Sequence, residues 1–273
     1  MAEGPLGRAA TLRLLEDHGI HPRRSLGQHF LVEPNIVRRI VEVAGVGPGS
    51  EVLEIGAGVG TLTRGLAAAG AAVTAIEIDE RLRPVLAEVL SGVPGVTVVF
   101  GDATRLDLAP ILGDRQWVVV ANLPYNVGTP LVLDLLRGTP QVVRLVVMLQ
   151  REAVERMAAE PGTKAYGLPS VVARLYAEVR VALRVAPTVF VPRPKVESAV
   201  AVLERRVPPR LAAAAVDLAA AAFGQRRKML RRSLRSILAD PEEALADAGI
   251  DPTRRAEDLH PDEYLRLAEA ARA

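Results

Sequence analysis

The 273-residue sequence has no cysteine, few histidines and no long apolar run. Without cysteine, disulfides and thiolate metal sites are excluded, and redox chemistry leaves the compartment open. The four histidines, at positions 18, 21, 29 and 260, are not spaced as a ligand cluster, so we expect no metal site. No apolar run approaches the roughly 20 residues of a membrane span, and the N-terminal residues lack a signal peptide's apolar core. We therefore expect a cytoplasmic protein without a membrane partner.

The composition is otherwise that of a folded protein. Apolar residues make up 49% and charged residues 24% of the chain, which fits neither a disordered nor a fibrous class. The length allows one large domain, or an average domain with a smaller one attached.

The net charge of +2 hides an uneven distribution along the chain. Residues 205–239 contain nine Lys or Arg and one acid, Asp217, whereas residues 240–273 contain ten acids and four arginines. Such a basic segment suggests an anionic partner. The alternative is a solvated helix face that the acidic tail balances.

Short apolar runs bounded by turn residues predict strands through the first two thirds of the chain. Segments with helical spacing separate most of these runs, which predicts an α/β fold with a mostly parallel sheet and helices on both faces. The two last runs lack a long helix between them and predict an antiparallel pair at one sheet edge. The predicted strands are EVLEI (51–55), AVTAIEI (72–78), VTVVF (96–100), WVVVA (117–121), RLVVML (144–149), AEVRVALRV (177–185) and SAVAVL (198–203).

Beyond residue 207 the strand signal disappears and only helical segments are predicted. We place a domain boundary there, which gives a first domain at 1–207 and a small all-helical domain at 208–273. The predicted helices are an Ala-rich segment (211–222), a basic one (224–238) and two short ones (241–248 and 261–272).

A glycine loop directly follows the first of these strands. Gly56, Gly58 and Gly60 lie between EVLEI and a helix that starts at Thr61. The carboxyl ends of parallel strands bind ligands, and glycine lets a ligand approach the backbone closely. The G-x-G-x-G spacing lacks the third glycine position of the dinucleotide fingerprint, because residue 61 is Thr. With Glu54 before it, the pattern is typical of S-adenosylmethionine-dependent methyltransferases, although a plain tight turn fits it too.

Polar residues also follow the next three predicted strands. Glu77 closes the second strand, where an acid can accept hydrogen bonds from both ribose hydroxyls. Asp102 follows the third strand and can accept from an adenine amino group. Asn122 follows the fourth and begins Asn-Leu-Pro-Tyr, which taken alone is an ordinary turn. We interpret the neighbouring Asp79 as a helix cap and Asp107 as a loop acid.

Taken together, these motifs make the chain resemble the KsgA family of ribosomal RNA adenine dimethyltransferases. The resemblance implies a Rossmann-like methyltransferase domain with a small C-terminal helical domain. It also implies dimethylation of two adjacent adenosines near the 3′ end of 16S ribosomal RNA in the small subunit, and a monomer. The motifs are SLGQHFL (25–31), VLEIGAGVGTLT (52–63), AIEID (75–79), GDA (101–103), ANLPYN (121–126), VFVPRPKVESAV (189–200) and FGQRRKMLRRSL (223–234).

The resemblance implies that Asn-Leu-Pro-Tyr grips the target base. Asn122 and the Leu123 carbonyl would accept the amino protons and aim the nitrogen lone pair at the methyl group, which is catalysis by positioning and electrostatics. Pro124 would fix the backbone, and Tyr125 would stack on a flipped-out base. Phe190 resembles the aromatic on the other face of the base, and a plain core Phe is the alternative.

The resemblance also implies S-adenosyl-L-methionine as the cofactor. The residues that would hold it are His29, Leu31, Gly56, Gly58, Glu77, Asp102 and Asn122. The family usually has Gln-Asn-Phe-Leu near the N-terminus, and this chain has Gln28-His29-Phe30-Leu31. Histidine can still donate to a cofactor carboxylate or ribose.

The basic segment predicts an RNA-binding surface, because phosphate contacts position RNA without reading its sequence. We expect one helix with Phe223, Met229, Leu230, Leu234, Ile237 and Leu238 packed inward. The expected RNA-binding residues on it are Arg226, Arg227, Lys228, Arg231, Arg232 and Arg235.

Three other functions remain open from the sequence. A macrolide-resistance methyltransferase of the large-subunit RNA shares the fold, but its motif usually reads Asn-Ile-Pro-Tyr or Phe, whereas residue 123 is Leu. A nicotinamide oxidoreductase is disfavoured by Thr61. A non-catalytic RNA-binding or assembly factor is disfavoured by the intact Glu77, Asp102 and Asn122.

Overall fold

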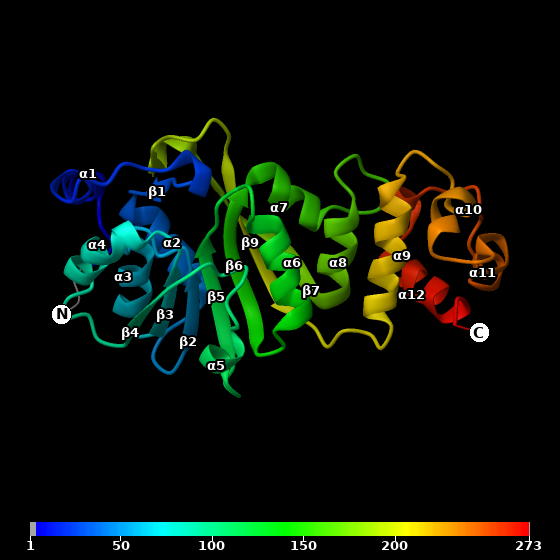
Figure 1. Ribbon diagram of the computed structural model, residues 1–273, viewed down its shortest axis with the longest axis horizontal. Helices are drawn as coiled ribbons and strands as arrows, with labels where there is room; N and C mark the ends of the chain where they lie inside the picture. Colours follow the sequence, from blue (N-terminus) through cyan, green and yellow to red (C-terminus); the bar gives the residue numbers. More distant parts are fainter. Residues whose placement is uncertain (1–3, 273) are drawn as a thin grey trace. The chain divides into compact units, whose positions relative to one another are not determined.

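The computed structural model describes residues 4–272 and contains two compact units (Figure 1). The first unit holds the described residues up to Arg151 together with Arg180–Glu204. The second holds Glu152–Val179 and the described residues from Arg205 onward. The domain boundary near residue 207 stays a proposal. The two units differ from it because residues 152–179, which precede this boundary, belong to the second unit together with the C-terminal residues. None of the helices in residues 4–272 is long and apolar enough to cross a membrane.

A seven-stranded sheet has the strand order β4-β3-β2-β5-β6-β9-β7. The strands from β4 to β6 are parallel, β9 is antiparallel to β6, and β7 lies beyond β9 at the edge. The predicted strand runs are therefore present, and the reversal of direction falls between β6 and β9. The strands are β2 (Glu51–Ile55), β3 (Ala72–Glu77), β4 (Val96–Phe100), β5 (Trp117–Asn122), β6 (Val142–Gln150), β7 (Ala177–Val185) and β9 (Ser198–Arg205).

Helices cover the sheet of the first unit. One face packs Val52, Val73 and Val146 into a single core with α2, α3 and α4. Leu53 and Val147 have the opposite parity and are equally buried, and α6 packs against β6. Both faces are therefore apolar, as the continuous hydrophobic runs predict. The helices are α2 (Pro34–Ala44), α3 (Thr61–Ala68), η2 (Glu80–Leu82), α4 (Arg83–Val89), α5 (Ala109–Leu112) and α6 (Gly128–Gly138).

An N-terminal arm precedes the sheet. It contains α1 (Arg8–Asp17), η1 (Arg24–Leu26) and the short strand β1 (Phe30–Leu31). β1 pairs antiparallel with β8 (Phe190–Val191), which follows η3 (Pro187–Val189). The arm residues just before β1 are therefore held close to the loop after β8.

The second unit is helical, and α8 and α12 both pack against α9. Leu175 of α8, Ala219 of α9 and Leu267 of α12 are among its buried residues. The elements are α7 (Arg151–Ala158), α8 (Leu168–Tyr176), α9 (Ala212–Gly224), α10 (Leu230–Ser233), η4 (Leu234–Ser236), α11 (Pro241–Asp247), η5 (Ala256–Asp258) and α12 (Pro261–Ala270).

The single basic helix expected over 224–238 is wrong. α9 ends at Gly224, a turn follows, and only the short α10 and η4 are helical. The backbone of this segment pairs with a later one, because Leu230 N–H donates to the Arg254 carbonyl at 2.8 Å and Met229 forms a β-bridge with Arg255. Tertiary pairing therefore overrides local helix propensity here. Met229 and Ile237 are 38% and 45% exposed, so they do not pack inward as expected.

Candidate active site

Parallel strands bring the predicted site residues together at the carboxyl ends of the strands. The registers pair Ile55 with Ile76 and with Ala121, and Glu77 with Phe100. The residues after each of these strands therefore lie at the same level. Two cavities open at these strand ends, and they share Leu26, Gly56, Ile78, Leu123 and Pro124 in their walls.

The predicted residues divide between the two cavities. The first is lined by His29, Leu31, Gly56, Gly58, Glu77 and Asn122 through Tyr125. Asp102 lines the second cavity, and Gly56 lines both. The constellation predicted from four strand ends is therefore assembled around the glycine loop.

The glycine loop needs glycine for its backbone and for its neighbours. Gly56, Gly58 and Gly60 have φ values of 82°, 57° and 81°, a region that side chains disfavour. A Cβ on Gly58 would also lie 3.2 Å from the Phe30 ring. The first turn of α3 thus begins against the arm, with the backbone exposed to the cavity.

Glu77 is held rigidly between the loop and the strand. Its Oε2 accepts from Gly58 N–H at 2.7 Å and its Oε1 accepts from Asp79 N–H at 2.8 Å. The carboxylate is 5% exposed, and burial raises its pKa while these two amides oppose the shift. Each oxygen keeps lone pairs with which it can accept from a ligand hydroxyl.

Asp79 caps η2, as its interpretation as a helix cap predicts, and it also ties down the arm. Its side chain accepts from Arg81 N–H and from the Arg81 guanidinium, and Gln28 Nε2 donates to Asp79 Oδ2 at 2.8 Å. These hydrogen bonds, mainly those from Arg81, hold the pKa of Asp79 below its usual value. Arg23 N–H in turn donates to Gln28 Oε1.

Asp102 lies in a tight turn after β4. Its Oδ1 accepts from Thr104 N–H at 2.9 Å and from the Thr104 hydroxyl at 2.7 Å, which lowers the pKa of Asp102. Its Oδ2 lies 3.6 Å from the exposed Arg105 Nε. One carboxylate oxygen therefore fixes the turn, and the other can accept from a ligand. Asp107 accepts from Ala109 N–H, in agreement with its interpretation as a loop acid.

Asn-Leu-Pro-Tyr forms a turn and also faces the cavity. Asn122 Nδ2 donates to the His29 carbonyl at 3.2 Å. The side-chain oxygen of Asn122, Oδ1, can therefore accept from a ligand. The Pro124 carbonyl accepts from Gly128 N–H at 2.9 Å and starts α6. A Cβ on Gly128 would lie 2.1 Å from Leu149, so this start of the helix requires glycine.

Two aromatic residues of the predicted site behave differently. The Tyr125 ring stacks on His29, with centroids 5.7 Å apart, and its hydroxyl bonds Ser198 Oγ at 2.7 Å. His29 Nδ1 lies 2.7 Å from the Pro192 carbonyl and donates a hydrogen bond to it. Phe190 is 2% exposed, packs in the core through β8, and lines neither cavity. It occupies the core position that the sequence left open as the alternative.

Glu54 is a site residue that the sequence analysis used only as part of a pattern. It lines the first cavity, is fully buried, and neither carboxylate oxygen has a hydrogen-bond partner among residues 4–272. Burial raises the pKa of Glu54 to about 8, nearby Thr63 opposes the shift, and the charge of Glu77 adds to it. Its apolar neighbours in EVLEI signalled burial, but no local pattern signals a missing partner.

The basic residues of the second unit fall into two groups. Arg226 donates to Glu257 at 2.7 Å and to the Lys164 carbonyl at 3.1 Å. Arg227, Lys228, Arg232 and Arg235 are exposed, and Arg231 is half-buried. Within the part of the chain that the structure describes, no hydrogen bond or ion pair is found for the side chains of these five residues.

Comparisons with known proteins match nearly the whole chain to one family. The family model described as ribosomal RNA adenine dimethylase matches residues 20–272. A ribosomal RNA small subunit methyltransferase A from Phenylobacterium zucineum is 46% identical, over 95% of this chain and 92% of that protein. The protein of the same name from Enterococcus faecalis is 43% identical, over 95% and 94%. The one from Rhodospirillum rubrum is 46% identical, over 100% and 96%.

Solved structures share the fold. The 23S rRNA methyltransferase ErmE is 28% identical with a TM-score of 0.69, over 89% of this chain and 100% of that one. A dimethyladenosine transferase from Plasmodium falciparum is 24% identical with a TM-score of 0.75, over 88% and 96%, and its likeness concerns the fold alone. These matches confirm the expected Rossmann-like methyltransferase fold with C-terminal helices.

Proposed function

Because the chain belongs to the ribosomal RNA adenine dimethylase family, we propose that it dimethylates two adjacent adenosines near the 3′ end of 16S ribosomal RNA in the small subunit. The geometric observation that carries the proposal is Asn122. Its side-chain nitrogen is engaged with the His29 carbonyl, its side-chain oxygen is not used in that bond, and Asn122 lines the cavity beside the glycine loop. An amino group placed there meets an acceptor whose orientation is already fixed.

The residues around the two cavities fit S-adenosyl-L-methionine. Glu77, held by two amides, would accept from both ribose hydroxyls, and Asp102 would accept from the adenine amino group. Gly56 and Gly58 line the first cavity without side chains, which would allow a ligand to approach their backbone closely. His29 and Leu31 would close the cavity from the arm. When bound, this cofactor supplies a sulfonium methyl group that is already a strong electrophile.

The chain's own contribution is to prepare the acceptor nitrogen. The amino lone pair of adenine is delocalised into the ring, so the nitrogen is a poor nucleophile. The Asn122 side-chain oxygen and the Leu123 carbonyl would accept hydrogen bonds from its two N–H groups and favour a tetrahedral geometry. Acceptors fixed before the reaction stabilise the developing charge without reorganisation. Tyr125 would stack on the flipped-out base, opposite or in place of His29.

The exposed basic residues of the second unit support RNA binding by phosphate contacts. Arg227, Lys228, Arg232 and Arg235 form no ion pair among the described residues and would attract the RNA backbone, as would Arg231, which also acts electrostatically on Asp251. We propose that residues 208–273 supply most of this surface. Arg226 differs from them because Glu257 already neutralises it.

Two alternatives differ in substrate or in activity. Similarity to ErmE supports action on large-subunit RNA, but the small-subunit relatives match at much higher identity. An assembly factor without activity would not need the arranged Glu77, Asp102 and Asn122.

The test is transfer of tritiated methyl groups from labelled S-adenosylmethionine. Undermethylated small subunits, large subunits and protein-free large-subunit RNA serve as parallel substrates. We expect up to four methyl groups per small subunit and none on the large-subunit RNA. Transfer to the large-subunit RNA alone, or binding to small subunits without transfer, would support one of the alternatives instead.

A further inference from the structure

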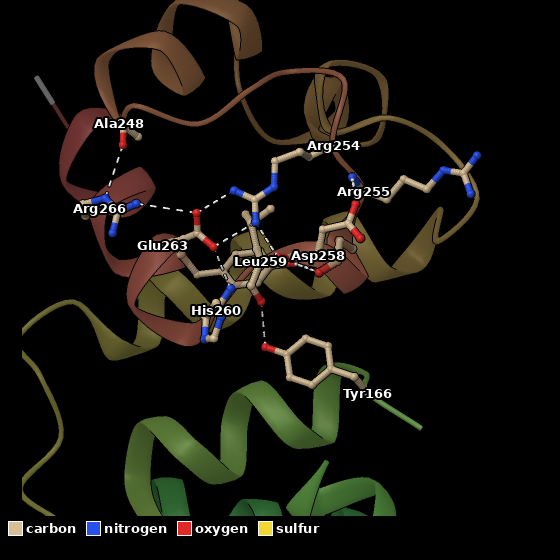
Figure 2. Close-up of polar contacts among 11 residues, drawn as sticks. Tyr166, Ala248, Arg254, Arg255, Asp258, Leu259, His260, Glu263 and Arg266 are labelled. Atoms are coloured by element: carbon tan, nitrogen blue, oxygen red, sulfur yellow. Dashed lines mark hydrogen bonds and ion pairs between the residues drawn. The ribbon is translucent and has the colours of Figure 1, made fainter. Parts of the chain in front are cut away.

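The loop between α7 and α8, residues 159–167, is fastened to the C-terminal part of the second unit. Gly162 N–H donates to the Glu257 carbonyl at 2.8 Å, and the Tyr166 hydroxyl donates to the Leu259 carbonyl at 2.8 Å. Figure 2 shows the second bond reaching from the start of α8 to the segment before α12. The loop backbone is therefore fixed at two points beside the basic segment.

Arg226 provides a third attachment. Its Nε donates to Glu257 Oε2 at 2.7 Å, and its Nη2 donates to the Lys164 carbonyl at 3.1 Å. One guanidinium thus joins the basic segment, the α7–α8 loop and η5. A guanidinium that is engaged with a carboxylate and a carbonyl has less charge and fewer donors left for a phosphate. This distinguishes Arg226 from its neighbours Arg227 and Lys228.

Lys164 adds an unpaired charge to this place. It is exposed, and no side-chain partner is found for it among residues 4–272. Because its carbonyl is held by Arg226, its ammonium group extends from an ordered backbone position. The charge split of the sequence begins at residue 205, so it gives no indication that Lys164 joins the basic segment.

Two acids of the C-terminal segment, Glu257 and Glu263, form ion pairs with cations outside this group. Glu257 pairs with Arg226, and Asp258 accepts from Arg255 N–H at 2.9 Å. Glu263 forms a two-pronged pair with Arg254 and accepts from His260 N–H, as Figure 2 shows. The acidic tail therefore neutralises Arg226 and Arg254 and leaves Arg227, Lys228 and Lys164 charged.

We propose that Lys164, Arg227 and Lys228 form one phosphate-binding cluster for RNA, and that the Arg226–Glu257 ion pair is the device that positions it. The proposal rests on the RNA-binding function proposed above and assigns Lys164 and Glu257 roles in it. Lys164, Arg227 and Lys228 contact phosphates directly. Arg226 and Glu257 act through the loop, so they are positioning residues.

Glu257→Ala separates this proposal from simple electrostatics. Removing an acid from a basic surface should strengthen RNA binding if only net charge matters. If Glu257 positions the cluster, its removal releases Arg226 from the ion pair, loosens the hold of Arg226 on the Lys164 carbonyl, and weakens binding. Asp262→Ala is the matched control, because Asp262 is exposed at the start of α12 and the charge change is identical.

The measurement is binding of the full chain to undermethylated small subunits over a range of salt concentrations. We expect Lys164→Ala, like Arg227→Ala, to lower the slope of log affinity against log salt by about 1, because one phosphate contact is lost. We expect Glu257→Ala to weaken binding several-fold and Asp262→Ala to strengthen it or leave it unchanged. Melting temperature and affinity for S-adenosylmethionine should stay near wild type in all four variants.

The outcomes distinguish the inference from the function on which it rests. If Arg227→Ala lowers the slope but Lys164→Ala does not, the RNA surface stands and the cluster is wrong. If Glu257→Ala strengthens binding as Asp262→Ala does, the positioning role is wrong. If none of these variants changes the slope, the cluster is overturned together with the RNA-binding role of Arg227, while methyl transfer is tested separately.

Discussion

Asn122 and Tyr125 are each held at one end and offered to a ligand at the other. Asn122 is fixed through its amide nitrogen on the His29 carbonyl, and Tyr125 through its hydroxyl on Ser198. The Asn122 oxygen and the Tyr125 ring are the parts that the proposed reaction uses. For Tyr125, variants can therefore remove the anchor separately from the ring.

We expect Asn122→Ala to lower the methylation rate by a few orders of magnitude while cofactor and RNA binding fall much less. The lost interaction is felt mainly in the transition state. Tyr125→Phe and Ser198→Ala remove the same hydrogen bond and should both keep most activity. Tyr125→Ala removes a stacking interaction worth about 1–3 kcal/mol per base and should lose most of the activity.

Single-turnover rates corrected for the folded fraction test this expectation. If Asn-Leu-Pro-Tyr were only a turn, Asn122→Ala and Tyr125→Ala would lower thermal stability first, and activity would follow the amount of folded protein. A corrected rate for Asn122→Ala close to wild type would contradict the proposed role.

Glu54 makes folding stability depend on pH. Its pKa is raised from 4.5 to about 8 in the folded protein, so the folded state binds this proton more tightly than the unfolded state does. Its contribution is fully present below pH 4.5 and is lost as the pH rises toward 8. Glutamine has nearly the same shape and does not titrate.

Glu54→Gln should therefore gain stability relative to wild type as the pH rises from 5 to 8. The gain should approach about 1 kcal/mol for each pH unit, because wild-type Glu54 releases its proton on unfolding, which becomes more favourable as the pH rises, whereas glutamine does not titrate. Urea unfolding at several pH values measures it, with the exposed Glu42→Gln on α2 as the control. A difference from wild type that is the same at pH 5 and pH 8 would show that Glu54 is already charged at low pH.

At the scale of elements, the sequence predicts what local pattern determines. β2 and β4 have the predicted bounds 51–55 and 96–100, because each is an apolar run bounded by turn residues. The glycine loop and the strand-end residues follow from the same parallel topology. The helix over 224–238 failed because residues 252–255, distant in sequence, take up the backbone of Met229 and Leu230.

The arm before β1 is an element whose position depends on a few polar contacts. Gln28 joins Arg23 to Asp79, and the residues from Leu26 to Leu31 form one wall of the first cavity. No apolar cluster fastens the segment 21–28, in which every described residue is exposed or half-buried. The polar contacts of Gln28 are therefore the main interactions that keep this segment in place.

Gln28→Ala should speed tryptic cleavage after Arg23 and Arg24 and weaken binding of S-adenosylmethionine. The variant breaks the link to Asp79 without removing the cap that Asp79 provides to η2. Glu80→Gln, which changes only an exposed pair with Arg83, is the control. Addition of S-adenosylhomocysteine should slow the cleavage in wild type. Equal cleavage rates in wild type and Gln28→Ala would show that Gln28 does not hold the arm in place.

At the scale of the whole molecule, the second unit is discontinuous in sequence. It takes Glu152–Val179 from the middle of the chain and joins it to the C-terminal helices. Within it the Tyr166 ring packs edge-on against Phe223, at 6.0 Å between centroids, and α8 packs on α9 and α12. A linear sequence with a single composition change at 207 cannot reveal such an insertion, because α7 and α8 have ordinary helical patterns.

This organisation predicts how the chain responds to truncation at 207. A fragment of residues 1–207 keeps α8, which has buried apolar residues, but removes α9 and α12, against which α8 packs. Exposed apolar surface of this kind binds hydrophobic dyes and promotes aggregation. We expect the fragment to bind anilinonaphthalene sulfonate and to exchange the amide hydrogens of α7 and α8 rapidly. It should still bind S-adenosylmethionine, because both cavities lie in the first unit.

The matched comparison is a fragment that omits the whole second unit. It ends at Glu204 and replaces residues 152–179 by a flexible Gly/Ser linker of about 10 residues, whose r.m.s. span is roughly 15–20 Å. Because it lacks α8, this fragment has no helix whose apolar face has lost its packing partners. It should therefore unfold cooperatively and bind little dye while keeping its cofactor affinity. If the boundary at 207 instead separates two independent domains, the fragment 1–207 will be the better folded of the two, with slow exchange in α8 and no dye binding.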